Sequence, residues 1–201
     1  MHQLDLELLE ELRRSTREEL RFLSNSGREE RERWVVSEYL TRQKVEFSEE
    51  ELRSPHQHSK TDVEFRDARF QVKEILNPGT KRYRDVKAKY DHLMTANSLQ
   101  DIAWPMFGYD IPPITTIYSL VSAEALSLSV ASKYATEKAN LDLIFYVTRT
   151  HASLIHKEEI DREYLSSIGW RSISCLAGNQ AIALFVGRNA PSFLRSLQNG
   201  G

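Results

Sequence analysis

The sequence is poor in cysteine, in long hydrophobic runs and in any surplus of charge, and each shortage excludes a class of protein. Its 201 residues include one cysteine, Cys175, which rules out an intramolecular disulfide framework and a cysteine-built zinc site. A single cysteine is typical of a reducing compartment, so we expect a cytoplasmic location. Because 27 basic residues stand against 29 acidic ones, for a net charge of -2, any attraction to nucleic acid must be local.

Membrane segments and two common catalytic motifs are also missing from the sequence. The least polar stretch, residues 114–135, contains Glu124 and five serines, which is too polar for a membrane span. The first residues mix acidic and basic side chains among leucines, unlike a signal peptide. No glycine-rich phosphate loop and no Gly-X-Ser-X-Gly motif is present, which argues against nucleotide kinases and serine hydrolases. We expect no membrane partner.

Two helices are predicted at the start of the chain. Leucines recur at helical spacing from Leu4 to Leu23 among dense Glu and Arg, which predicts an amphipathic helix. A second helix is predicted over residues 28–42. We expect residues 1–27 to form an N-terminal helical extension and residues 28–201 to form a single α/β domain. The leucine-bearing helix offers an association surface, so a homodimer is one expected assembly.

The remaining segments predict a mixed sheet flanked by helices. Polar and apolar residues alternate in residues 62–66 and 69–75, which predicts a β-hairpin joined near Asp67-Ala68. The elements that follow are, in order, a basic helix, a long buried helix, a strand, a helix and two more strands, over residues 80–96, 114–138, 141–147, 157–168, 170–176 and 181–186. This order predicts an α/β or α+β architecture.

The predicted hairpin gathers polar side chains on one face. Pairing its strands about that turn places Asp62 opposite Lys73 and Glu64 opposite Gln71, and strand alternation points all four to the same side. Cross-strand neighbours have Cβ atoms roughly 5 Å apart, within reach of one hydrated ion. Carboxylate and amide oxygens suit magnesium or manganese, and such an ion would stabilise charge on a phosphate. Lys73 could orient or deprotonate a water bound to the ion.

This arrangement resembles the PD-(D/E)XK nuclease superfamily, whose restriction-endonuclease-like core runs helix, β-meander, helix, strand. The signature there is an Asp near the start of one strand and an acidic-X-Lys tripeptide in the next. This chain has Asp62 and, nine residues later, Gln71-Val72-Lys73. Many members add a glutamate from the preceding helix, where Glu38 stands in Trp-Val-Val-Ser-Glu-Tyr-Leu. The sequence is also similar to a small uncharacterised bacterial family described as "putative endonuclease". The resemblance covers residues 28–147.

The resemblance implies a metal-dependent endonuclease that cleaves phosphodiester bonds, with DNA as the expected substrate. It implies a restriction-endonuclease-like mixed sheet and a site with Mg²⁺ or Mn²⁺ as cofactor. Lys73 would act with Asp62 and Gln71 in catalysis by positioning the attacking water. The implied metal ligands are all oxygen donors, namely Asp62, Gln71, the Val72 carbonyl and, as auxiliary ligands, Glu38 or Glu64.

The sequence departs from the superfamily pattern at two positions. Thr61 stands where the motif has proline, a change that is common in the superfamily. Gln71 stands in the acidic position, as in some active members with Gln-X-Lys. A neutral amide lowers the negative charge that holds a divalent cation.

A basic helix follows the hairpin and is the expected nucleic-acid surface. Its positive side chains could meet phosphates and supply the local attraction that the net charge lacks. These residues are Lys81, Arg82, Arg84, Lys87 and Lys89. A charged helix is also an ordinary solvated face.

Two plainer interpretations of the hairpin stay open. A surface hairpin commonly alternates charged and apolar residues, and Asp62 facing Lys73 could be a cross-strand ion pair with no catalytic role. The fold could also belong to a catalytically inactive descendant that serves as a binding or assembly module. Gln71 favours this alternative, because it weakens the metal site.

Overall fold

The computed structural model describes residues 3–56, 59–102, 113–149, 152–153 and 160–199, and the chain divides into two compact units. The first unit contains Met1–Arg31 and Pro78–Asp110, and the second contains Glu32–Asn77 and Ile111–Gly201. Helix α2, Arg28–Arg42, spans the boundary at residue 31. The predicted division into residues 1–27 and 28–201 stays a prediction, because a packing unit is not by itself an independently folding domain.

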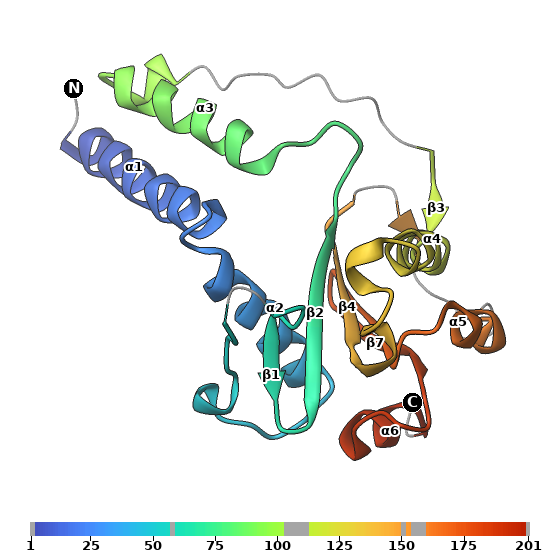
Figure 1. Cartoon of the computed structure of the whole chain (residues 1–201). Helices are drawn as coiled ribbons and strands as arrows, with labels where there is room; N and C mark the ends of the chain where they lie inside the picture. Colours follow the sequence, from blue (N-terminus) through green and yellow to red (C-terminus); the bar gives the residue numbers. More distant parts are fainter. Residues whose placement is uncertain (1–2, 57–58, 103–112, 150–151, 154–159, 200–201) are drawn as a thin grey trace. The chain divides into compact units, whose positions relative to one another are not determined.

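The first unit is built from two helices, α1, Gln3–Leu23, and α3, Arg82–Thr95 (Figure 1). The sequence predicts both helices to within a few residues, and the structure confirms them. Arg13 of α1 donates hydrogen bonds to the carbonyls of Leu93, at 3.1 Å, and Ala96, at 2.7 Å. These carbonyls close α3 and have no partner inside the helix, so Arg13 satisfies them. The apolar contact beside Arg13 is formed by Leu9, Leu93 and Ala96.

The second unit contains a five-stranded sheet in the order β1-β2-β4-β6-β7. Its strands are β1 Val63–Phe65, β2 Ala68–Ile75, β4 Asp142–Val147, β6 Ser172–Ala177 and β7 Gln180–Val186. The three central strands run parallel, while β1 and β7 are antiparallel edge strands. This confirms the predicted mixed α/β sheet. A separate parallel pair joins β3, Thr115–Thr116, to β5, Ala152–Ser153.

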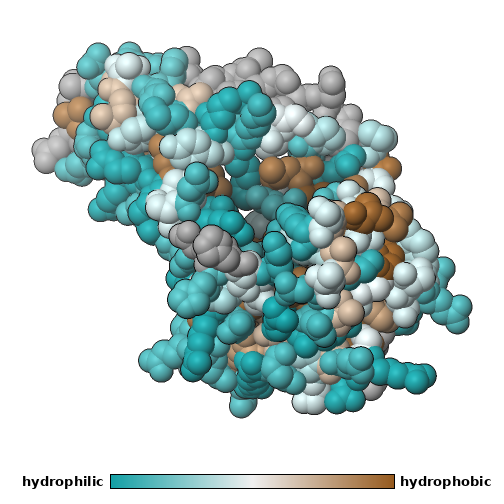
Figure 2. Space-filling view, viewed as in Figure 1, coloured by the Kyte–Doolittle hydropathy of each residue, from teal (hydrophilic) through white to brown (hydrophobic). Residues whose placement is uncertain are grey.

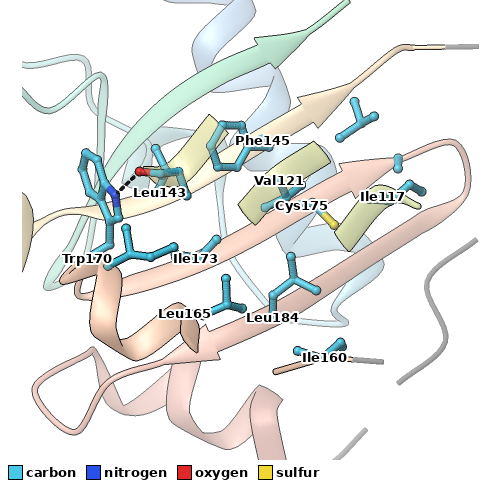
Figure 3. Packing of buried hydrophobic residues seen from close by; sticks show 14 of the residues in the cluster. Ile117, Val121, Leu143, Phe145, Ile160, Leu165, Trp170, Ile173, Cys175 and Leu184 are labelled. Carbon is cyan, nitrogen blue, oxygen red and sulfur yellow. Dashed lines mark hydrogen bonds between the residues drawn. The ribbon is translucent and has the colours of Figure 1, made fainter. Parts of the chain in front are cut away.

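Helices cover both faces of the five-stranded sheet (Figure 1). Helices α4, Ile117–Ser129, and α5, Arg162–Ile168, pack on one face, where Trp170 Nε1 donates to the Ala125 carbonyl at 3.0 Å (Figure 3). Helices α2 and α6, Ser192–Asn199, pack on the other face. We call these the α4/α5 face and the α2/α6 face. Their cores differ in the strand residues they use: Leu143, Phe145 and Cys175 on the first, and Phe70, Val72 and Ile144 on the second.

Strand alternation assigns Gln71 and Lys73 of β2 to one face. Gln71 pairs in register with Leu143, and Lys73 pairs with Phe145. Because in-register neighbours of a sheet point to the same side, Gln71 and Lys73 belong to the α4/α5 face. Val72, which lies between them, belongs to the α2/α6 face.

The predicted hairpin exists, but its predicted register is wrong by two residues. The observed pairs are Val63 with Phe70, Glu64 with Arg69, and Phe65 with Ala68, so the turn lies at Arg66-Asp67, one residue earlier than expected. Arg66 makes this turn with a φ of 53°, without the glycine that such a conformation favours. Because a two-residue shift keeps every side chain on its side, the predicted polar face survives the correction.

The predicted helix over residues 114–138 is too long. Helix α4 ends at Ser129, and two short 3-10 turns follow at Ser132–Tyr134 and Lys138–Asn140. The chain turns there because Tyr134 enters the core, where it is 2% exposed and packs against Trp170. Within the described ranges, no helix combines the length and apolarity needed to cross a membrane.

The structure adds elements that the sequence analysis missed. Helix α6 follows β7, and its Phe193, Leu194 and Leu197 pack on the α2/α6 face. A short 3-10 turn, Glu49–Glu51, lies between α2 and β1. The first part of the helix predicted over residues 157–168 falls outside the described residues; the described part, α5, is confirmed.

Candidate functional site

Asp62 stands directly before β1, and the neighbouring strand holds it in place. Its backbone N–H donates to the Phe70 carbonyl at 2.8 Å. Its side-chain Oδ2 accepts hydrogen bonds from the backbone N–H of Val72, at 2.8 Å, and from Gln71 Nε2. The side chain is only 5% exposed. The hairpin therefore fixes this buried carboxylate through both main chain and side chain.

Gln71 is a buried amide with a hydrogen-bond partner at each end. Its Nε2 donates to Asp62, and its Oε1 accepts from the hydroxyl of Tyr134 at 3.0 Å. The residue is 3% exposed. The amide thus bridges the hairpin to the chain that follows α4.

Lys73 lies at the more open side of this pair. Its Nζ is 3.9 Å from Asp62 Oδ2 and donates to the Val72 carbonyl at 2.9 Å. Its side chain is 25% exposed, so water reaches the amine while the carboxylate behind it is buried. The structure therefore brings together three predicted site residues, Asp62, Gln71 and Lys73.

Glu64 lies farther along β1 and has different neighbours. It is paired with Arg69 in the hairpin, not with Gln71, and forms an isolated antiparallel bridge with Arg53. Its exposed side chain lines an open pocket with Glu51, Arg53 and Arg66. Charges in this pocket are balanced, with two carboxylates against two guanidinium groups.

Glu38 lies on α2 and accepts a hydrogen bond from Arg42, one turn along, at 2.9 Å. The buried residues of α2, including Val35 and Tyr39, pack on the α2/α6 face. Gln71 and Lys73 point to the opposite face. The structure therefore gives Glu38 a partner on its own helix and places that helix across the sheet from the two side chains.

The predicted nucleic-acid residues lie in the first unit. Helix α3 has four basic and two acidic residues, and Lys81 precedes its first turn. Arg84 pairs with Asp85, at 3.2 Å, and Lys87 pairs with Asp91, so part of the positive charge is neutralised on the helix itself. The exposed members of the predicted set are Lys81, Arg84 and Lys87; Arg82 and Lys89 are half-buried.

A groove opens where β2 ends in the second unit. It has a volume of about 470 Å³ and is lined by the end of β2, by α4 and by Arg149, which follows β4. The Nε of Arg149 is buried and has no hydrogen-bond partner among the described residues. Two carboxylates, Glu74 and Glu124, also line the groove, so it can meet both acidic and basic groups of a ligand.

Sequence reasoning missed two residues, Tyr134 in the site and Asp142 elsewhere in the sheet. Tyr134 fell inside the predicted long helix, and nothing in the sequence distinguishes it from other core aromatics. Asp142 begins an otherwise apolar strand and is fully buried, which calls for partners. It accepts hydrogen bonds from Arg171 Nε at 3.1 Å, Ser172 Oγ at 2.8 Å and the backbone N–H of Arg69 at 3.0 Å. A lone carboxylate in an apolar run is the signal that could have found this network.

Cys175 is an inert core thiol. It is 1% exposed, and burial raises the pKa of its thiol to about 12. A thiol with so high a pKa carries almost no thiolate at neutral pH, so it is no nucleophile.

Comparison with known proteins gives one family and one solved structure. A family model described as "putative endonuclease, protein of unknown function (DUF1780)" matches residues 4–200, well beyond the expected residues 28–147. A protein of unknown function from Pseudomonas aeruginosa strain PAO1, described as a member of the monooxygenase superfamily, has a similar solved structure. The TM-score is 0.59 at 25% identity, covering 98% of this chain and 92% of that one. No curated protein matches the chain. The resemblance to the PD-(D/E)XK superfamily stays a prediction.

Proposed function

The chain belongs to the family described as "putative endonuclease, protein of unknown function", and from that premise we propose that it is a metal-dependent endonuclease that cleaves phosphodiester bonds in DNA. The observation that carries the proposal is the meeting of a carboxylate, an amide and an amine on adjacent strands. Asp62 and Lys73 lie 3.9 Å apart, and Gln71 is hydrogen-bonded to Asp62. Burying a carboxylate is costly unless it is hydrogen-bonded or paired, and Asp62 meets that condition with neutral donors that leave its charge in place beside the amine.

The donor set fits magnesium or manganese, provided that one side chain reorients. These ions need only one or two carboxylates and retain several waters. Asp62 would be the carboxylate, and the Val72 carbonyl and Gln71 Oε1 would be neutral donors, although that Oε1 now faces Tyr134. Among the residues described, no group of three His, Cys, Asp or Glu side chains could hold a metal ion. We therefore expect an ion bound through few protein ligands and several waters.

The protein groups around that position have distinct roles in the proposal. When bound, the ion would stabilise charge on the scissile phosphate and acidify a coordinated water. Lys73 would orient the attacking water through Nζ, which is exposed enough to reach it. Asp62, 5% exposed, would hold its charge in a region of low dielectric, where its attraction for a cation is stronger than at the surface.

Two features support a polyanionic substrate. Exposed basic side chains on α3 and just before it, Arg84 and Lys81 among them, offer contacts to phosphates. In the second unit, the groove at the end of β2 is lined by Arg149. A guanidinium on the wall of a groove suits a phosphate oxygen. The groove begins at Glu74, the residue next to Lys73, so it lies along the same strand as the proposed site.

Cleavage of plasmid DNA with Mg²⁺ or Mn²⁺ tests the proposal. We expect nicking by the wild-type chain and its loss in Lys73→Ala and Asp62→Asn, by about 100-fold or more. Both variants should keep the wild-type circular dichroism spectrum. Parallel assays with RNA and single-stranded DNA define the substrate.

Arg195→Ala is the matched control, since it removes an exposed positive charge from α6 on the other face of the sheet. It should cut like the wild type. A Lys73→Ala protein as active as the wild type would overturn the proposal.

A catalytically inactive binding or assembly module is the second candidate, and one observation favours it. The Gln71 amide is already hydrogen-bonded at both ends, to Asp62 and to Tyr134, which is what a purely structural amide would show. On the surface, hydrophobic side chains form small patches in a mainly hydrophilic face (Figure 2). Leu6 and Leu8 of α1 are 41% and 48% exposed and offer a contact for a second copy of the chain. A module of this kind would self-associate, lose association in Leu8→Glu, and bind no manganese.

A further inference from the structure

Tyr134 is held so firmly that its hydroxyl has a fixed position. The residue is 2% exposed and lies in the short 3-10 turn after α4. Its ring meets Trp170 edge to face, with centroids 5.3 Å apart, and the Lys133 ammonium lies 4.6 Å from its centroid. These contacts leave the ring little freedom. The hydroxyl is thereby aimed at Gln71 Oε1, 3.0 Å away.

The hydrogen bonds around Gln71 run in one direction. Tyr134 donates to Gln71 Oε1, Gln71 Nε2 donates to Asp62, and Asp62 also accepts from the backbone of Val72. The amide nitrogen therefore faces the carboxylate. An amide nitrogen carries two hydrogens and no available lone pair, so only the amide oxygen can ligate a cation. In this orientation Gln71 cannot be a metal ligand.

A half-turn of the amide exchanges the positions of its oxygen and nitrogen, with a small adjustment of the Asp62 contact and a rotation of the Tyr134 hydroxyl hydrogen. Oxygen and nitrogen of a glutamine amide exchange places with almost no change of shape. Gln71 Oε1 would then face the ion position beside Asp62, and Nε2 would face Tyr134. A tyrosine hydroxyl can accept a hydrogen bond as well as donate one, so it can serve either orientation. A phenylalanine at 134 could serve neither.

We propose that Tyr134 is a positioning residue for the metal site, and that its hydroxyl allows the Gln71 amide to turn its oxygen toward a divalent cation. The inference rests on the proposed function and explains how a neutral Gln-X-Lys site binds an ion. The resting orientation keeps Asp62 hydrogen-bonded when no ion is bound. The turned orientation stays satisfied at both ends, because Nε2 donates to the tyrosine hydroxyl.

Removing the Tyr134 hydroxyl should destabilise the turned, ion-binding orientation of Gln71 more than the resting orientation. The affinity for the ion should therefore fall. In the turned orientation, loss of the hydroxyl leaves a buried Gln71 N–H without an acceptor. In the resting orientation, it leaves the Gln71 carbonyl oxygen without this donor. An unsatisfied buried N–H is the rarer and costlier of the two. We expect Tyr134→Phe to lower the affinity for Mn²⁺ about fivefold to tenfold.

A double-mutant cycle separates this role from general damage to the core. Gln71→Glu presents an oxygen to the ion in either orientation, so no turn is required. The loss caused by Tyr134→Phe should shrink to about twofold or less in the Gln71→Glu background. Tyr39→Phe is the matched control, since Tyr39 is also buried and its hydroxyl bonds Ser174, at 3.1 Å, on the α2/α6 face. It should leave Mn²⁺ affinity unchanged.

The cycle is measured by calorimetric titration of the full chain with Mn²⁺, and thermal unfolding checks that each variant folds. NMR of the Gln71 side-chain amide, with diamagnetic Mg²⁺, gives a second readout in the wild type, where we expect both N–H signals to shift on binding. Equal Mn²⁺ affinity in wild type and Tyr134→Phe would overturn this inference but leave the proposed function standing. The inference would also be overturned if Tyr134→Phe lowered Mn²⁺ affinity as much in the Gln71→Glu background as in the wild type. If the wild type binds no Mn²⁺, the inference and the proposed function fail together.

Discussion

Two buried carboxylates of the same sheet, Asp142 and Asp62, are held in different ways. Asp142 is fully buried and receives both arms of the Arg171 guanidinium, together with the Ser172 hydroxyl at 2.8 Å. Asp62 receives hydrogen bonds from neutral donors, the Gln71 amide and the Val72 backbone. Its contact with a cation is longer, at 3.9 Å to Lys73.

The difference separates a carboxylate that stabilises the fold from one suited to chemistry. A bidentate guanidinium neutralises Asp142 and locks the starts of neighbouring strands together. Neutral hydrogen bonds orient Asp62 without cancelling its charge, and a partly exposed amine stands beside it. The first arrangement leaves no charge for a further cation, whereas the second leaves a charge that the proposed ion would bind.

The largest expected effect concerns stability. Arg171→Met should lower the free energy of unfolding by about 3–5 kcal/mol, because Asp142 would stay buried without its cation. Asp62→Asn should cost only about 1 kcal/mol, since asparagine keeps an oxygen acceptor for the same donors. Urea denaturation at neutral pH measures both.

The double variant Arg171→Met with Asp142→Asn is the control, and it should recover part of the loss because the buried charge is gone. If Asp62→Asn proves as costly as Arg171→Met, then both carboxylates are structural and the comparison fails.

Gln71→Glu should have an intermediate effect. It should increase the difference between the surroundings of Asp62 and those of Asp142. A second carboxylate beside Asp62 should raise the affinity for Mn²⁺ by about tenfold, because the site gains a negative charge. Without metal the two like charges should lower the melting temperature. Thermal unfolding with and without Mn²⁺ measures both changes, since ion binding stabilises the folded chain in proportion to its affinity. Unchanged or weaker Mn²⁺ binding would show that position 71 does not face the ion.

The smallest effects should come from Glu38→Gln and Glu64→Gln. The structure gives Glu38 a partner on its own helix and places Glu64 among two guanidinium groups. Each variant should change Mn²⁺ affinity by less than about twofold. A loss of about tenfold in either variant would restore that glutamate as the auxiliary ligand that the resemblance implies.

The sequence predicts most of the fold because hydrophobic periodicity reports local structure. Helix α2 and the strand around residues 142–147 follow directly from their patterns. The end of α4 does not, because the chain leaves the helix to bury Tyr134, and that demand arises from tertiary packing. The hairpin register was predicted wrongly for a similar reason, since Arg66 adopts a left-handed turn conformation without the glycine that would mark it in the sequence.

Only part of the candidate site can be predicted from the sequence. Asp62, Gln71 and Lys73 could be grouped because they lie within one hairpin, where a spacing of two sets the face. Tyr134 lies 63 residues from Gln71, and no local pattern connects them. The placement of Glu38 likewise depends on which face α2 covers, which a sequence pattern does not specify.

Calorimetric titration with Mn²⁺ in chelator-treated buffer, on the wild-type chain and on Asp62→Asn, tests the central claim most directly. The account predicts one ion per chain with a dissociation constant between about 1 μM and the low millimolar range, and affinity at least about tenfold weaker in Asp62→Asn. No measurable binding by the wild type, or equal binding by both proteins, would contradict it.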